Sequence, residues 1–266
     1  MLYQEYEIAV PLKPFVKVIW SMESSGAAVG IPPMRILPDS CVELVIHFHD
    51  PYSTTFGSGK TDPQPKSMIV AQMKDYIEIS PNGRIGMVSV RFSAHGAYHF
   101  FGVPMKEIAN GITDLRLVWK NLACEIEERI AGCTNTAERI SVLQTYLIAQ
   151  LLRNGQEDRT VDYCLELIYN SKGLVSIADL SVKTGTSNRQ LVRRFNNRIG
   201  VSPKEFARII KFISAVNYLK SNASSGFAEV ALDCGYYDQA HFIRDFKEFT
   251  GLTPGEFLTT DMNVVL

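Results

Sequence analysis

The stretch from Ile177 to Phe206 reads IADLSVKTGTSNRQLVRRFNNRIGVSPKEF, and the stretch from Phe227 to Phe257 reads FAEVALDCGYYDQAHFIRDFKEFTGLTPGEF. The two stretches align with one extra residue in the second copy, placed after its turn. The matched positions include both turn glycines, Gly185 and Gly235, and both Gly-x-Ser/Thr-Pro ends. A repeat of this length indicates two copies of one structural unit.

The first copy has the pattern of two short helices joined by a tight turn. Ser176 and Asp179 have capping-box spacing, so we expect a helix over residues 177–184. Gly185 ends that helix, because glycine adopts a positive φ at little cost. The residues expected to face inward are Ala178, Leu180 and Val182.

The second helix of each copy carries a buried stripe and an outward face. Ser187 and Gln190 predict a helix over residues 188–199, with Leu191 and Phe195 buried. Asp238 predicts the corresponding helix over residues 239–249, in which Phe242 and Phe246 face inward. The arginines Arg189, Arg193 and Arg194 project away from the first stripe, so each copy is a helix-turn-helix candidate.

Charge supports nucleic-acid binding locally and not globally. The chain has 27 Lys and Arg against 28 Asp and Glu, for a net charge of -1. Between Ser187 and Lys220 eight basic residues face one acid, Glu205, which leaves a net +7 (8 minus 1). Such a stretch, with exposed helical arginines, is typical of a DNA-binding surface. The alternative is a solvated helix face, and the tandem repeat favours DNA binding over it.

Residues 160–260 resemble the DNA-binding domain of the AraC/XylS family of bacterial transcription regulators. The resemblance is carried by GYYDQAHFIRDFK at Gly235–Lys247, by Gly251-Leu252-Thr253-Pro254 and by Phe257. It implies seven helices that hold two helix-turn-helix units. A linker helix at about Pro203–Ser221 would space two reading helices so that they enter adjacent major-groove turns, about 34 Å apart.

The resemblance also implies which side chains contact DNA. Base edges would be contacted by Arg189, Val192 and Arg193 from the first reading helix and by Gln239, Ala240, His241 and Arg244 from the second, with Arg194 and Arg198 on phosphate. Val192 and Ile243 depart from the family pattern, because many members have a polar residue there. Four acids lie near the second unit (Asp233, Asp238, Asp245 and Glu248), so we expect the first unit to dominate affinity.

Residues 1–93 read as strand-rich. Short runs rich in Val, Ile, Phe and Tyr lie between turn clusters of Gly, Pro, Asn, Asp and Ser, which predicts an antiparallel sheet or small barrel. The runs cover residues 15–22, 34–37, 41–49, 68–71, 76–80 and 85–93. Helical patterns follow at residues 119–131 and 135–155. We therefore expect an α+β chain divided at a polar segment into residues 1–156 and 157–266.

Residues 35–45 and 88–92 resemble the cupin-like β-barrel fused to many regulators of this family. The resemblance implies that residues 1–156 sense a small molecule and mediate dimerisation. Candidates for an effector pocket are Arg35, Asp39, Glu43, His47 and Arg91, although buried ion pairs would explain the charged ones equally well. The stripe Leu143, Leu147 and Leu151 could be core or a partner helix, and the family resemblance favours a dimer face.

A metal-dependent cupin-type enzyme with an accessory helical domain is the alternative function. His47 and His49 would share one face of a strand, as two metal-binding imidazoles should. His49 is followed by a turn, however, and no complete ligand set can be assembled. A DNA-repair enzyme would need a reactive cysteine, and Cys41 has acidic neighbours that oppose thiolate formation. No metal, cofactor or catalytic residue is therefore predicted.

Composition fits a globular protein of the cytoplasm, and the family resemblance implies a bacterial one. Hydrophobic residues are 46% and charged residues 21%, and no apolar run approaches the roughly 18–20 residues of a membrane span. No signal peptide and no CxxC pair are visible. We expect a sequence-specific regulator, an activator by family precedent, nucleoid-associated when bound. Its expected partners are double-stranded DNA, an unknown small-molecule effector and a second copy, with RNA polymerase left open and no membrane.

Overall fold

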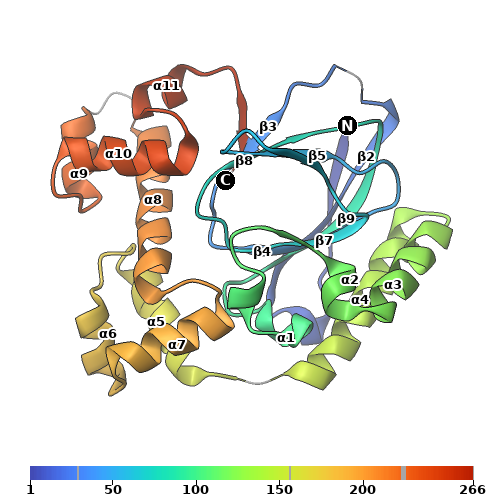
Figure 1. The fold of residues 1–266 in the computed structure, drawn as a ribbon, viewed down its shortest axis with the longest axis horizontal. Coiled ribbons are helices and arrows are strands. Elements are labelled where there is room, and N and C mark those ends of the chain that lie inside the picture. The colour runs from blue at the N-terminus through green and yellow to red at the C-terminus, as the bar shows by residue number, and fades with distance from the viewer. Residues whose placement is uncertain (29, 156, 223–225, 266) are drawn as a thin grey trace.

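A computed structural model describes residues 1–28, 30–155, 157–222 and 226–265 of the chain. A β-rich N-terminal part lies beside a helical C-terminal part (Figure 1). The α+β class predicted from the sequence is confirmed. The predicted boundary falls beside Gln156, which lies outside the described residues, so the division into 1–156 and 157–266 stays a prediction.

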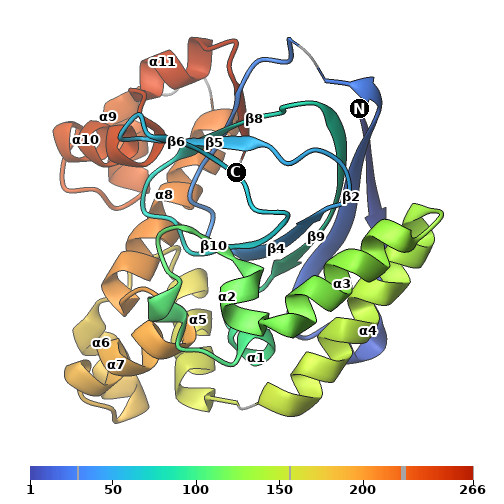
Figure 2. The same ribbon diagram turned by 45° about the vertical axis from the view of Figure 1, so that its right-hand side comes forward.

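Two sheets face each other in the N-terminal part (Figure 2). The first is antiparallel, with strands in the order β1 (Leu2–Tyr6), β2 (Val16–Ala27), β9 (Arg84–Phe92), β4 (Val42–His47), β7 (Ser67–Val70) and β10 (Ile112–Asp114). The second has the order β11 (Asn263–Val265), β3 (Met34–Ile36), β8 (Ile77–Ser80), β5 (Ser53–Phe56) and β6 (Thr61–Pro63).

The expected closed barrel is corrected to two open sheets. No strand ladder joins the sheets within the described ranges. The edge strands β6 and β10 are three residues long, and Pro63 in β6 has no N–H to donate to a further strand. The ends of the sheets therefore stay unpaired where a barrel would close.

Helices cover the outer face of the first sheet (Figure 2). These are α1 (Tyr98–Phe101), α2 (Leu115–Trp119), α3 (Asn121–Gly132) and α4 (Thr136–Asn154), with the short 3-10 helices η1 (Val10–Leu12) and η2 (Met105–Glu107) beside them. The helix expected over residues 119–131 is broken at Lys120, which has a φ of 53°.

The leucine stripe of α4 packs in the apolar core between these helices and the first sheet. Leu143 and Leu147 are fully buried with Leu44 and Val90 of the sheet, and Leu151 packs at the edge of the same cluster. The interpretation of this stripe as a dimer face is therefore wrong, because α4 uses it to pack on its own sheet.

Seven helices form the C-terminal part as described: α5 (Arg159–Asn170), α6 (Ile177–Thr184), α7 (Asn188–Arg198), α8 (Pro203–Ser221), α9 (Phe227–Asp233), α10 (Gln239–Thr250) and α11 (Pro254–Thr259). They enclose two apolar cores, one for each repeat, and α8 contributes Phe206 to the first and Phe212 to the second. The expectation for α6 is corrected: Leu180 is buried, but Ala178 is exposed and Val182 is 82% exposed. Because α6 is only about two turns long, a single side chain of its inner face, Leu180, is fully buried in this core.

The chain returns to the first domain at its last strand. Strand β11 runs parallel to β3, and the Leu37 N–H donates to the Val265 carbonyl (2.9 Å). Leu37 and Val264 pack with the core of the second repeat. None of the described helices is both long and apolar enough to span a membrane.

Candidate nucleic-acid interface

The first helix-turn-helix unit is built by local interactions that the sequence predicted. Ser176 with Asp179 and Ser187 with Gln190 both form reciprocal capping boxes at the starts of α6 and α7. Gly185 ends α6 with a φ of 61°, the left-handed region that glycine enters readily. These caps fix where each helix begins, and hence which side chains face outward.

Burial of Leu191 and Phe195 turns the opposite face of α7 to the surface. Arg189 and Arg193 are exposed and Val192 is half-buried. All three line a groove of about 450 Å³, together with Gln190, Asn196, Asn197 and Lys106. The three residues expected to contact bases are thus on one side of the helix.

Arg194 and Arg198 both contact other parts of the protein. Arg194 Nη1 donates to Asp158 Oδ1 (2.9 Å) just before α5. The Arg198 guanidinium lies 4.0 Å from the centroid of the Tyr98 ring in α1. Their expected role on phosphate stays a prediction, and Arg198 also helps to hold the two domains together.

The second unit repeats the geometry of the first. Gly235 has a φ of 71° at the turn, and the Asp238 side chain accepts from the His241 N–H (2.7 Å) at the start of α10. Phe242 and Phe246 are fully buried. The outward residues are Gln239, Ala240 and Arg244, with His241 half-buried against the Tyr236 ring.

Two acids of α10 are bound to a cation of α8. Arg208 Nε donates to Asp245 Oδ1 (2.5 Å), and its Nη2 donates to Glu248 Oε2 (2.5 Å). The Arg208 hydrogen bond holds the pKa of Glu248 below its usual value. Asp245 is 4% exposed and also accepts from the Tyr236 hydroxyl (3.2 Å). Arg208 belongs to the basic stretch between Ser187 and Lys220, but its charge is therefore paired with Asp245 and Glu248.

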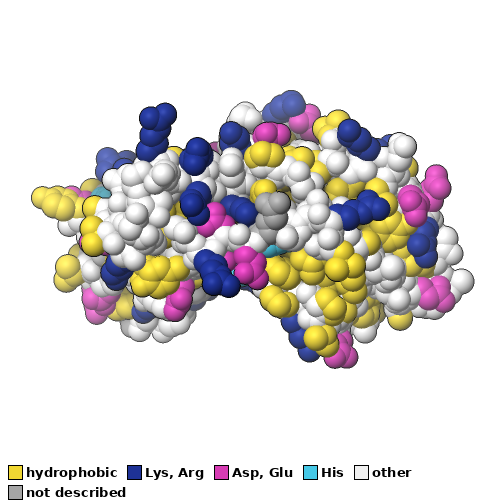
Figure 3. Space-filling view, turned by 90° about the horizontal axis from the view of Figure 1, so that it is seen from below, with side chains coloured by type: hydrophobic (Ala, Val, Ile, Leu, Met, Phe, Trp, Pro, Cys, Tyr) yellow, Lys and Arg dark blue, Asp and Glu magenta, His cyan; other side chains and the backbone are white. Residues whose placement is uncertain are grey.

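Basic side chains project from the helical half of the molecule but are interleaved with acidic ones (Figure 3). The net +7 of the linear stretch does not become one continuous basic face. Arg208 is bound to carboxylates, and the Lys211 ammonium lies 4.0 Å from the Tyr236 ring centroid. Of the eight basic residues in that stretch, only Arg189 and Arg193 of α7 line the groove described above.

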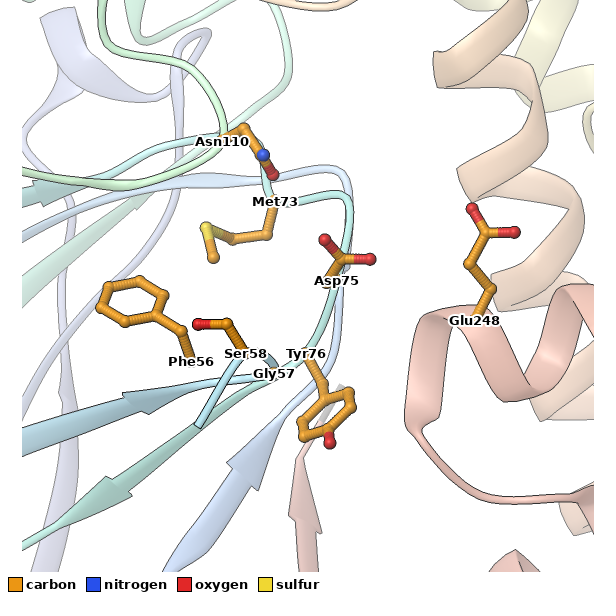
Figure 4. Close-up of a pocket in the computed structure, with 8 residues that line it drawn as sticks. All are labelled: Phe56, Gly57, Ser58, Met73, Asp75, Tyr76, Asn110 and Glu248. Atoms are coloured by element: carbon orange, nitrogen blue, oxygen red, sulfur yellow. The ribbon is translucent and has the colours of Figure 1, made fainter. Parts of the chain in front are cut away.

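Of the N-terminal candidates, Arg35 lies at the boundary between the domains. Its Nε donates to Glu78 Oε1 (3.0 Å), and its Nη1 donates to the Thr250 carbonyl at the end of α10 (2.8 Å). The guanidinium also stacks on Tyr76 at 4.1 Å. Beside it, a cleft of about 430 Å³ separates Tyr76 and Asp75 from Glu248 of α10 (Figure 4).

Glu43 and His47 point into the space between the two sheets. Glu43 Oε1 accepts from the Trp20 indole (2.8 Å), and burial raises the pKa of Glu43. Nε2 of His47 lies 3.0 Å from the Gln64 amide oxygen, and burial lowers the pKa of His47 to about 4. Among the described residues, Nδ1 of His47 has no hydrogen-bond partner.

Asp39 and Arg91 form an ion pair elsewhere, in a cleft shared with Lys17, Cys41 and Ile213 of α8. The five candidate residues therefore do not line one pocket, and their role in binding an effector stays a prediction. Arg35 is set apart because β3 belongs to the other sheet, whereas Glu43 and Arg91 are cross-strand partners on β4 and β9 whose side chains bind different groups.

The histidines and the cysteine considered for metal and thiol chemistry are His47, His49 and Cys41. Strand β4 ends at His47, so the alternation that would align His49 with it stops there. Within the described ranges no group of three His, Cys, Asp or Glu could hold a metal ion. Burial raises the pKa of Cys41, which opposes thiolate formation.

Comparison with known families agrees with this geometry. Residues 180–260 match the family described as a helix-turn-helix domain, and they span both units. This match agrees with the resemblance of residues 160–260 to the AraC/XylS DNA-binding domain. Residues 4–114 match a family described as a domain of unknown function, DUF6597.

Three known proteins are similar to all or part of this chain. The transcriptional regulator MtrA of Neisseria gonorrhoeae is 25% identical over 156 residues, 54% of this chain and 52% of that protein. GbdR of Pseudomonas aeruginosa is 31% identical over 80 residues, 30% of this chain and 22% of that protein. The structure of ToxT from Vibrio cholerae aligns with 96% of this chain and 97% of its own, at 10% identity and a TM-score of 0.45. The chain spans about half the length of the first curated relatives that it matches.

Proposed function

We propose that the chain is a sequence-specific DNA-binding regulator of transcription. The observation that carries the proposal is the pair of helix-turn-helix units joined by α8. With 19 residues, α8 is about 28 Å long, close to the ~34 Å between successive major-groove turns on one face of DNA. In this proposal α7 and α10 each enter one of those turns.

The proposed contacts follow from exposure on the two reading helices. Arginine in the major groove pairs with guanine through two hydrogen bonds, which suits Arg189, Arg193 and Arg244. The remaining proposed contacts are Val192, Gln239, Ala240 and His241 on base edges, with Arg194 and Arg198 nearest phosphate. Ile243 packs against the core of its unit, so we propose no readout there.

We further propose that a small molecule binds between the two sheets of the N-terminal part. His47 is buried with its Nδ1 unpartnered among the described residues and Glu43 is half-buried beside the Trp20 indole, so hydrogen bonds to a polar ligand would offset a cost of burial. The ligand would act by binding one arrangement of the chain more tightly than another. Activation, homodimerisation, a contact with RNA polymerase and action in the bacterial cytoplasm belong to the same proposal, which includes no enzymatic activity.

A selection of genomic fragments tests the proposal. The full chain is incubated with fragments at about 150 mM salt and excess random competitor, conditions that suppress non-specific binding. We expect bound fragments to share two short elements about one helical turn apart, upstream of genes. The control is the double variant Arg193→Ala, Arg244→Ala, which should enrich nothing.

Two results would contradict the proposal. One is a failure to enrich any fragment both with and without added cell extract, which would supply a missing effector. The other is equal enrichment by the chain and by its double variant, because the reading helices would then not select the DNA.

A further inference from the structure

The short helix η2 of the N-terminal domain lies directly against the first reading helix. Lys106, in the middle of η2, is exposed and lines the same groove as Arg189, Val192 and Arg193. Glu107, the next residue, is exposed but does not line the groove. A cation from a different domain is therefore placed beside the side chains expected to contact bases.

The position of η2 relative to α7 is set by close contacts. Gly200, just after α7, packs so tightly that an added Cβ would lie 3.1 Å from the Met105 carbonyl oxygen. Nearby, the Lys74 ammonium forms an ion pair with Glu205 at the start of α8 (2.6 Å). Ala94, before α1, belongs to the apolar core of the first helix-turn-helix unit. Lys106 is consequently held beside α7.

The chemistry of the groove suits a phosphate. Its described lining combines three cations (Lys106, Arg189 and Arg193) with three side-chain amides (Gln190, Asn196 and Asn197), and it contains no carboxylate. When a helix enters the major groove, the two phosphate backbones run along its flanks. The flank of α7 that faces η2 is where one of those backbones would pass.

We propose that Lys106 binds a DNA phosphate beside α7, so that the N-terminal domain forms part of the DNA interface. The inference rests on the proposed function of α7 as a reading helix. As a compact ammonium on a flexible stem, Lys106 would add affinity without base preference. Its contribution would also depend on η2 staying docked, and hence on the state of the N-terminal domain.

The test measures binding of the full chain to a fluorescent duplex of about 40 base pairs, long enough for two adjacent groove turns. Lys106→Ala should weaken binding about three- to tenfold at low salt and reduce the slope of log K against log salt by about 0.9. The loss should be the same for different duplex sequences. Lys106→Arg should retain wild-type binding.

The matched control is Lys66→Ala. Lys66 is also an exposed lysine of the N-terminal domain, but it lies near Glu127 of α3, away from α7. Its loss should leave affinity and salt slope unchanged. Circular dichroism of each variant checks that folding is intact.

The outcomes separate this inference from the function beneath it. If Arg193→Ala weakens binding and Lys106→Ala does not, the inference is overturned and the reading helix stands. Tighter binding by Lys106→Ala would also overturn it, since η2 would then obstruct the DNA. If neither variant changes binding, the proposed function of α7 itself fails.

Discussion

The two helix-turn-helix units share a backbone plan and matched core positions, but they use two other matched positions in opposite ways. Arg194 of the first unit corresponds to Asp245 of the second, and Arg198 corresponds to Phe249. Arg194 reaches outward to Asp158, whereas Asp245 is buried and bound by Arg208. One fold can therefore present charge in one copy and bury it in the other.

The units also differ in how they attach to the N-terminal domain. The first is held by the Arg198 and Tyr98 stack, by the Lys74 and Glu205 ion pair, and by packing against Met105 and Ala94. The second is held partly by backbone, because Arg35 donates to the Thr250 carbonyl and β11 joins a sheet. Only the second attachment therefore uses strand pairing, and the exposed Lys74 and Glu205 pair of the first contributes little stability.

The largest expected effect tests whether the two units have equivalent cores. Phe195→Ala and Phe246→Ala remove matched, fully buried rings, and each should cost about 3–5 kcal/mol of unfolding free energy. Phe246 contacts the rings of Phe212, Phe242 and Phe257, so its loss should fall at the upper end. Urea unfolding followed by circular dichroism measures both. If either substitution left the unfolding free energy unchanged, the two cores would not be equivalent.

The charge cluster of the second unit should give the next largest effect. Arg208→Ala leaves Asp245 buried without its cation, which should cost about 2–3 kcal/mol. The matched comparison is Arg194→Ala, which breaks a partly exposed pair and should cost about 0–1 kcal/mol. Hydrogen exchange should show faster opening of α10 in the first variant only. Equal losses would mean that the cluster does not distinguish the units.

Matched arginines on the reading helices sharpen the comparison in DNA binding. Arg193→Ala should cost about 1–3 kcal/mol on the specific site and relax base preference there. Arg244→Ala should cost less, because the carboxylates of Asp245 and Glu248 lie in the same helix. Competition with base-substituted duplexes measures both losses. A larger loss from Arg244→Ala would reverse the expected dominance of the first unit.

The smallest difference concerns the capping boxes of the two helices that follow the reading helices. These are Ser202 with Glu205 at the start of α8 and Thr253 with Glu256 at the start of α11. Burial opposes ionisation of Glu205, but Lys74 and Ser202 outweigh it and lower its pKa to about 2. The backbone N–H and hydroxyl of Thr253 lower the pKa of Glu256, and Lys247 adds only a smaller, through-space contribution. Both carboxylates take up protons more readily when unfolded, so their stabilisation is full above pH 4.5 and is lost as the pH falls.

We therefore expect acid unfolding to separate the two boxes. Glu205→Gln should flatten the dependence of stability on pH between 4.5 and about 2 more than Glu256→Gln does. Lys74→Ala should reproduce part of the Glu205→Gln effect. Identical curves for the two glutamine variants would show that Lys74 contributes nothing.

The sequence predicts the repeats well because their determinants are local. Caps, turn glycines and four-residue stripes lie within a few positions of each other, and α7, α8 and α10 end within one residue of expectation. Strands with buried apolar runs were also found. Strands β1, β5, β6, β10 and β11 were missed, because each is three to five residues long and lacks a buried apolar run.

What depends on distant partners could not be predicted in the same way. Exposure of Arg189, Arg193 and Arg244 follows from helix periodicity. The bond from Arg35 to Thr250 and that from Arg208 to Asp245 join residues far apart in sequence. Lys106 has no motif around it, so its place beside α7 appears only once the domains are assembled.

The parallel pairing of β11 with β3 also orders the events of synthesis. Strand β3 emerges from the ribosome long before β11, and until then its outer edge has no strand to bind. An open edge is a template for pairing with other chains, so the nascent chain passes through a period of increased risk of aggregation. The protein can complete its second sheet only after the helical repeats have been made.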